Sequence, residues 1–334
     1  MPEAAYVAVV RMKFEAMRGA KILVEQCLNI QPNEEFLVVT DTNKLGVSQL
    51  IAAAAAERDA NVSLAIMSPL PAPGMEPPKA ISAAMKVSDA IVMATTFTIT
   101  QSRAREEAQM LGARILSQGG VDENLLASNY YKVDYLKQKP LVDKVASMLS
   151  RSKKAKLTSD AGTSLEMSID GREAFSWNNV CHERGTLGSP PDIEACIAPL
   201  EDTANGTLIV DGSTTLAELG LLTEPIRIRI DRGTAVDIKG GAQAQRLKSK
   251  LESYSDPNVF RVGELGIGLN PTVSELVGIP LVDEGALGTV HIALGQNVTY
   301  HGNIVAKTHI DLIVKNATLA LDGATILKTG KLQL

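Results

Sequence analysis

The sequence has few cysteines, few aromatic residues and no long apolar run. Its three cysteines lie far apart and form no Cys-x-x-Cys pair, which argues against a disulfide framework and a zinc knuckle. Aromatic residues make up only 4% of the chain, so the cores are predicted to be aliphatic. No run approaches the roughly 18 apolar residues of a membrane span, and the N-terminus lacks a signal-peptide layout. These absences predict a cytoplasmic protein that does not enter a membrane.

Positive charge is not concentrated in any one segment. The formal net charge is -5, and no basic tract stands out, so a nucleic acid is excluded as the predicted partner. The glycine patterns that cradle nucleotide phosphates, GxGxxG after the first strand and GxxxxGK[ST], do not occur. The chain is therefore not expected to bind a nucleotide.

Residues 1–150 alternate between helical and strand patterns. Helices are predicted at 5–30, 45–59, 81–87, 102–111 and 141–151, and strands at 35–40, 62–67, 90–94 and 113–117. Strands separated by helices are typical of a largely parallel sheet. We therefore expect an α/β scaffold domain over residues 1–150.

The pattern changes in residues 151–334. Residues 226–230 alternate strictly between apolar and basic side chains, turn at 231–233 and continue as a second strand, which is a hairpin signature. Further strands are predicted at 207–211, 290–294 and 310–314, with one helix at 242–251. The second half is predicted to be a mostly antiparallel α+β domain, and it holds the residues with metal-binding chemistry.

Three of the four histidines fall within 19 residues of this second half. His309 and Asp311 are two apart in a predicted strand, so both side chains point to one face of a sheet. His291 lies in the preceding strand, and a glycine- and asparagine-rich loop that contains His301 returns the chain toward His309. An imidazole and a carboxylate presented together are good ligands for a divalent transition metal.

Carboxylates in apolar settings extend this set. Glu264 lies within VGELGIG, Glu194 within DIEACIAP, and Glu284 shortly before the His291 strand. A buried carboxylate is costly unless it is paired or bound to a metal. Taken singly, each of these residues also fits a structural or solvated role; together they predict a divalent-metal site.

At these residues the sequence resembles the M29 family of metallo-aminopeptidases, of the aminopeptidase T type. The resemblance rests on the order GELGIGLNP, DEGALGTVHIALG and THIDLIV. It implies a dimer, and two metal ions held by Glu194, Glu264, His291, His309 and Asp311. Glu284 matches a further family glutamate, at a different spacing from His291.

The same framework is similar to 2,5-dihydroxypyridine 5,6-dioxygenase, a non-haem iron enzyme. That resemblance implies one iron held by two histidines and one carboxylate. One of those histidines falls at Glu264, and the other two ligands fall at His309 and Asp311. The positions of Glu194 and His291 are apolar in the dioxygenase, so the chain departs from it at three positions.

Because of these departures, we predict a divalent-metal-dependent hydrolase, most like an aminopeptidase. Two ions of Zn, Co or Mn would activate a water molecule, and Glu284 would serve as the catalytic base. The substrate would be a peptide or another small molecule, and the protein a homodimer. The alternatives are an Fe(II) ring-cleaving dioxygenase, a hydrolase of another amide or ring, and a binding protein without metal.

Overall fold

A computed structural model describes residues 3–216 and 218–334 of the chain. The chain divides into two compact units, which are described separately. The first comprises Met1–Lys139 with Asn179–Pro190, and the second Pro140–Asn178 with Pro191–Leu334. Within the described ranges, no helix combines the length and the apolar character needed to cross a membrane.

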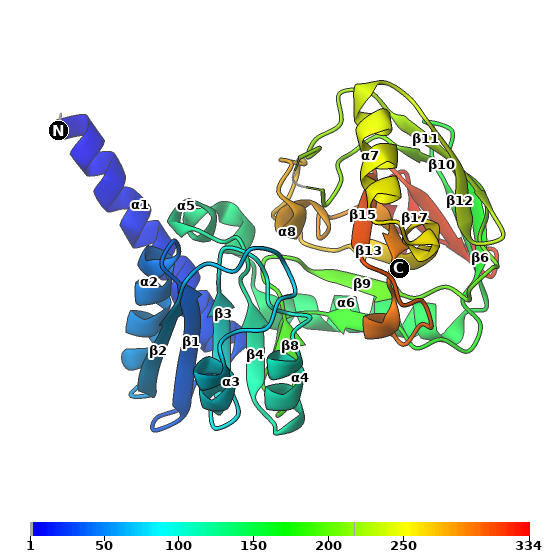
Figure 1. Cartoon of the computed structure of the whole chain (residues 1–334). Helices are drawn as coiled ribbons and strands as arrows, with labels where there is room; N and C mark the ends of the chain where they lie inside the picture. The colour runs from blue at the N-terminus through cyan, green and yellow to red at the C-terminus, as the bar shows by residue number, and fades with distance from the viewer. Residues whose placement is uncertain (1–2, 217) are drawn as a thin grey trace. The chain divides into compact units, whose positions relative to one another are not determined.

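The first unit is built on a parallel sheet, here called sheet A, with strand order β2-β1-β3-β4-β8 (Figure 1). Strands β1, β3 and β4 are buried almost throughout, as expected for the continuous apolar strands of a parallel sheet. The strands are β1 Glu35–Asp41, β2 Asn61–Met67, β3 Ala90–Ala94, β4 Arg114–Ser117 and β8 Leu187–Gly188. The helices are α1 Glu3–Ile22, η1 Leu23–Cys27, α2 Leu45–Ala56, α3 Lys79–Met85, α4 Arg103–Met110, α5 Glu123–Ala127 and η2 Asn129–Tyr131.

The second unit consists of two antiparallel sheets. Sheet B has strand order β12-β11-β10-β6-β5-β16-β17-β18, and sheet C has the order β15-β14-β13-β9-β7. The strands of sheet B are β5 Lys154–Thr158, β6 Ser164–Ser168, β10 Asn205–Val210, β11 Ile226–Asp231, β12 Thr234–Lys239, β16 Thr318–Leu321, β17 Ala324–Lys328 and β18 Lys331–Leu332. Those of sheet C are β7 Phe175–Trp177, β9 Glu194–Ile197, β13 Val262–Gly268, β14 Val290–Gly295 and β15 His309–Val314.

Short helices connect the strands of the second unit. They are α7 Ala242–Ser253, η3 Pro257–Phe260, α8 Pro280–Asp283 and η4 Val298–Tyr300, and α6 Tyr135–Arg151 precedes them in the chain. The predicted fold class, a parallel α/β half followed by a mostly antiparallel half, is confirmed. The single helix predicted over 5–30 is wrong in detail, because the α-helix ends at Ile22 and continues as the π-helix η1.

Candidate metal centre

Sheet C places the predicted ligands on one of its faces. Residues directly opposite each other on antiparallel strands point to the same side of a sheet. In this register Glu194 lies opposite Gly268, and His291 lies opposite Gly266, two residues after Glu264. Asp311 lies opposite Ala293, which also pairs with Glu264. Four adjacent strands therefore direct their acidic and imidazole side chains toward one region.

Glycine at position 266 makes room for this arrangement. A Cβ atom placed on Gly266 would lie 1.9 Å from His291 Nε2, so the imidazole lies directly over the backbone of β13. Any larger residue would displace the ring. Glycine at position 266 is thus a packing requirement of the site.

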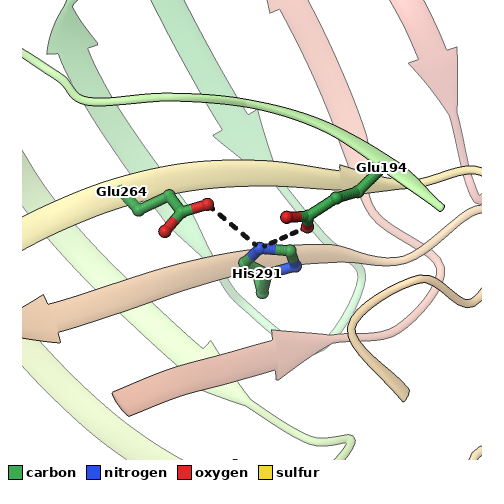
Figure 2. A group of neighbouring side chains, drawn as sticks. All are labelled: Glu194, Glu264 and His291. Atoms are coloured by element: carbon green, nitrogen blue, oxygen red, sulfur yellow. Dashed lines mark ion pairs between the residues drawn. The ribbon is translucent and has the colours of Figure 1, made fainter. Parts of the chain in front are cut away.

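Two groups of side chains meet on this face. His291 Nε2 lies 3.0 Å from Glu194 Oε2 and 3.7 Å from Glu264 Oε1 (Figure 2). His309 Nε2 lies 2.9 Å from Glu264 Oε2 and 3.3 Å from Asp311 Oδ1. In each group, one ligand atom per residue lies within 4.8 Å of the others. Glu264 belongs to both groups, so the predicted ligands form one continuous cluster.

The cluster is buried and short of hydrogen-bond donors. Glu264 and His291 are each 1% exposed. Glu194 Oε2, Asp311 Oδ1 and both oxygens of Glu264 are buried and have no aligned hydrogen-bond partner in residues 3–216 and 218–334. Such atoms are costly in a native protein unless a ligand satisfies them. The donor set of carboxylate oxygens and imidazole nitrogens fits a divalent transition metal.

Hydrogen bonds orient the ligands of the second group. His309 Nδ1 lies 2.7 Å from the carbonyl oxygen of Gln296. Because a carbonyl only accepts, Nδ1 carries a proton, and Nε2 faces Glu264 and Asp311 with the lone pair that a neutral ring would offer to a metal. The Thr215 hydroxyl donates to Asp311 Oδ2 over 3.3 Å, which leaves Oδ1 directed at the histidines.

The electrostatics of the metal-free cluster reflect its crowding. Burial disfavours the charged imidazole of His309, but Asp311 and Glu264 outweigh it and raise the pKa of His309 well above its ordinary value. Burial, opposed by His291, raises the pKa of Glu194, whereas His291 and His309 overcome burial to hold the pKa of Glu264 at about 2. A metal ion would replace the protons that hold these charges together.

Glu284 lies near the cluster but outside both ligand groups. It follows the short helix α8, and burial together with Asp311 and Glu194 raises its pKa well above the usual value. Asp192 has a similarly raised pKa, caused by burial and by Glu194, and sequence reasoning missed it. Its position two residues before Glu194, on an extended segment, was the available signal.

The remaining histidines lie elsewhere. His301 adopts a left-handed backbone conformation with a φ of 60°, and its carbonyl accepts a hydrogen bond from Arg172. His182 Nε2 contacts the carbonyl of Gln26 in the first unit. Neither belongs to the ligand groups found among the described residues. Sequence reasoning also missed Tyr300, whose ring centroid lies 5.5 Å from that of His309.

Known proteins share this fold over nearly the whole chain. A curated relative, 2,5-dihydroxypyridine 5,6-dioxygenase of Pseudomonas putida KT2440, is 23% identical over 74% of this chain and 71% of its own length. The solved dioxygenase structure from that organism has a TM-score of 0.83 at 19% identity, covering 96% of this chain and 97% of its own. Wild-type AmpT from Thermus thermophilus has a TM-score of 0.72 at 15% identity, covering 96% and 100%. The shared framework is confirmed.

The sequence profile of the family described as 2,5-dihydroxypyridine 5,6-dioxygenase matches residues 21–334. This match confirms the prediction of an enzyme, but it contradicts the predicted aminopeptidase-like hydrolase and supports the stated alternative. The prediction failed because the ligands were used to choose a reaction, whereas one framework with similar ligands hosts more than one chemistry. Since the match spans nearly the entire sequence, the chain belongs to the 2,5-dihydroxypyridine 5,6-dioxygenase family.

Proposed function

We propose that this protein is a metal-dependent dioxygenase that opens the ring of a hydroxylated pyridine. The observation that carries the proposal is the buried Glu264, His309 and Asp311 group in a chain that matches the dioxygenase family over residues 21–334. The curated relative is named for the same reaction class. The substrate would be a small aromatic molecule.

Glu264, His309 and Asp311 would hold an iron(II) ion. Two histidines and one carboxylate commonly bind such iron and leave positions open. Here Glu264 puts a carboxylate in place of one imidazole, which exchanges a borderline nitrogen donor for a harder oxygen donor and adds a negative charge. Bound iron would supply the dioxygen chemistry, which no side chain of the cluster can supply by itself.

Glu194 and His291 would handle a proton beside the iron ligands. Their closest atoms, Glu194 Oε2 and His291 Nε2, lie 3.0 Å apart, and both residues are buried. Burial raises the pKa of Glu194, whereas burial lowers the pKa of His291 but is outweighed by Glu194, which raises it. A proton shared between these two atoms could be exchanged with a ring hydroxyl of the substrate.

Iron content distinguishes this role from a second metal site. Glu194, Glu264 and His291 also form a group that could ligate an ion. One equivalent of iron per chain in the active enzyme would support the proton role. Two equivalents would instead assign Glu194 and His291 as ligands.

The proposal is tested by oxygen uptake. Protein loaded anaerobically with iron(II) should consume about one dioxygen per molecule of 2,5-dihydroxypyridine, and the ring absorbance should disappear at the same rate. The His309→Ala variant, treated identically, should do neither. Iron-loaded protein that leaves both dioxygen and the ring unchanged would refute the proposed substrate class.

A further inference from the structure

The loop between β14 and β15, residues 296–308, contacts the candidate ligand His309 in two ways. The Gln296 carbonyl accepts from His309 Nδ1 over 2.7 Å, which fixes the tautomer of the imidazole. The ring of Tyr300 lies against the same imidazole, with centroids 5.5 Å apart and planes inclined by 42°. A shift of this loop would therefore turn the His309 ring away from Glu264 and Asp311.

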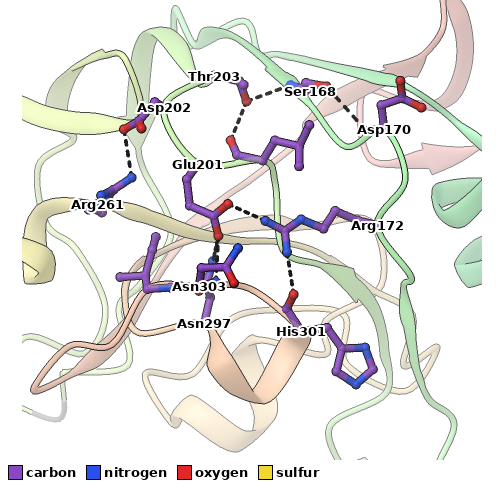
Figure 3. Close-up of polar contacts among 12 residues, drawn as sticks. Ser168, Asp170, Arg172, Glu201, Asp202, Thr203, Arg261, Asn297, His301 and Asn303 are labelled. Carbon is purple, nitrogen blue, oxygen red and sulfur yellow. Dashed lines mark hydrogen bonds and ion pairs between the residues drawn. The ribbon is translucent and has the colours of Figure 1, made fainter.

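A carboxylate outside the cluster holds the loop. Glu201 Oε1 accepts the backbone N–H of Asn303 over 2.8 Å, and Asn297 Nδ2 lies 3.5 Å from the same oxygen (Figure 3). Asn297 is fully buried, and its own side-chain oxygen accepts the N–H of Ile304 over 2.7 Å. Asn297 near the start of the loop is thus joined to residues 303 and 304 through one acidic side chain and one amide.

A single arginine completes this anchor. Arg172 pairs with Glu201 through one terminal nitrogen and donates to the carbonyl of His301 through the other. Its side chain is 11% exposed and that of Glu201 is 17% exposed, so water screens the pair weakly. The guanidinium fork can bridge two acceptors in a fixed geometry, which a lysine ammonium does less well.

We propose that Arg172 and Glu201 are positioning residues for the metal ligand His309, acting through the loop of residues 296–308. The inference rests on the metal-binding role proposed for His309. The inference does not depend on which ring substrate the enzyme uses. Neither residue reaches the ligand groups, and Gln296, whose carbonyl holds His309, is the neighbour of the anchored Asn297.

An adjacent ion pair provides a matched control. Asp202, the residue after Glu201, pairs with Arg261 over 2.8 Å, and this pair is also drawn in Figure 3. The Asp202 side chain is 69% exposed, and it pairs with Arg261, which lies outside residues 296–308. Glu201→Gln and Asp202→Asn each replace one carboxylate oxygen by an amide nitrogen, at neighbouring positions of one turn.

The test is a titration of the full-length protein with cobalt(II), followed by visible absorption. Changes in residues around a metal ligand commonly cost about ten- to a hundredfold in affinity, and an effect passed through a loop should be near the lower end. Glu201→Gln should weaken cobalt binding about tenfold and alter the absorption bands, because His309 is displaced. Asp202→Asn should change the affinity by less than about twofold and leave the bands unaltered.

Arg172→Lys is the milder variant if Glu201→Gln folds poorly by circular dichroism. It keeps the charge but loses the fork, and it should show the same altered bands at smaller amplitude. Equal cobalt affinity and identical bands in wild type, Glu201→Gln and Arg172→Lys would overturn this inference alone. Failure of the wild-type protein to bind cobalt would overturn the metal-binding proposal together with it.

Discussion

Buried carboxylates occur both at the end of strand β1 in sheet A and on the face of sheet C, but their surroundings differ. Asp41 is 1% exposed, and its oxygens accept hydrogen bonds from Asn43 N–H and from both the N–H and the hydroxyl of Thr96. Glu264 is equally buried, yet within the described residues neither of its oxygens has an aligned donor. Burial alone does not separate a structural carboxylate from a metal ligand. The neighbours do: N–H and hydroxyl donors surround Asp41, whereas imidazole nitrogens, which can bind a metal themselves, surround Glu264.

Asp41 is the last residue of β1 and lies at the carboxyl edge of sheet A. In a parallel sheet with strand order β2-β1-β3, the order of the strands reverses between β1 and β3, and ligands commonly bind at the carboxyl edge there. In this protein, segments of the chain contact one another at that edge. Asp41 links the segments after β1 and β3, and the Glu123 carboxylate lies against Gly46 in the first turn of α2.

Replacing a ligand on sheet C should give the largest effect. Asp311→Asn keeps the shape of the side chain but removes a charged donor from the group with His309 and Glu264. Metal affinity should fall by more than about a hundredfold, since even changes around a ligand can cost that much. The unfolding free energy of the metal-free protein should change by less than about 1 kcal/mol, because the lost attraction to His309 is offset by the relief of repulsion with Glu284. Metal titration and urea unfolding check both parts.

The corresponding change in sheet A should lower the stability of the protein and leave its metal affinity unchanged. Asp41→Asn places an amide group among N–H and hydroxyl donors, so at least one buried hydrogen bond is lost. The expected cost is about 2–4 kcal/mol of stability, because hydrogen bonds to a charged group are the stronger kind. Metal affinity should stay within about twofold of wild type. Loss of metal in this variant, with stability preserved, would reverse the assignment of the two regions.

The pH dependence of the metal-free protein should report the crowding on sheet C. The pKa of His291 and of His309 is raised on folding, so the stability they contribute is present below about pH 6.5 and is lost as the pH rises. The raised pKa values of Glu194 and Glu284 also lower the stability as the pH rises above about pH 4. The lowered pKa of Glu264 increases the stability as the pH rises, but this increase has reached its full value by about pH 5.

The melting temperature in the presence of a chelator should therefore fall between pH 6 and pH 9. Added metal should raise it more at pH 8 than at pH 6, because binding displaces protons from the ligands. Differential scanning calorimetry at several pH values measures both trends. A melting temperature that rises with pH in the chelated protein would be inconsistent with this description of the cluster.

Two glycines allow the smallest and most local comparison. A Cβ on Gly266 would meet His291 Nε2 at 1.9 Å, whereas the three atoms nearest a Cβ on Gly46 all belong to the Glu123 carboxylate, the first at 1.8 Å. Glu123 is a flexible side chain and can move, so Gly46→Ala should be neutral or stabilise α2 by up to about 1 kcal/mol. Gly266→Ala should displace His291 and impair whichever role it has. Activity of iron-loaded Gly266→Ala should fall about tenfold, and equal activity in both variants would argue against a functional His291.

Much of the fold could be predicted because its signals are local. Periodicity in the sequence predicts the apolar strands of sheet A and the alternating hairpin of β11 and β12. Strands β9 and β13 were not predicted, because both are short or rich in glycine and are buried along their whole length. Strand β8, by which residues 179–190 join sheet A, could not be predicted, because a strand of two residues has no periodic pattern.

The ligand residues were accessible to sequence reasoning, but the reaction was not. His309 and Asp311 share a face through simple alternation, and the structure brings them to Glu264, as expected. Their hydrogen-bond partners, Thr215 and the Gln296 carbonyl, depend on tertiary contacts that spacing does not reveal. The choice between hydrolysis and oxygenation depends on what binds beside the metal, and the ligand set alone does not specify that.

The central claim is that the donor-poor carboxylates of sheet C are metal ligands, and anomalous X-ray diffraction at the iron absorption edge tests it most directly. Crystals of the iron-loaded protein should show a peak about 2.0–2.2 Å from ligand atoms of Glu264, His309 and Asp311. No such peak should appear beside Asp41. An iron peak elsewhere in a protein that opens the pyridine ring, with this cluster free of metal, would contradict the account.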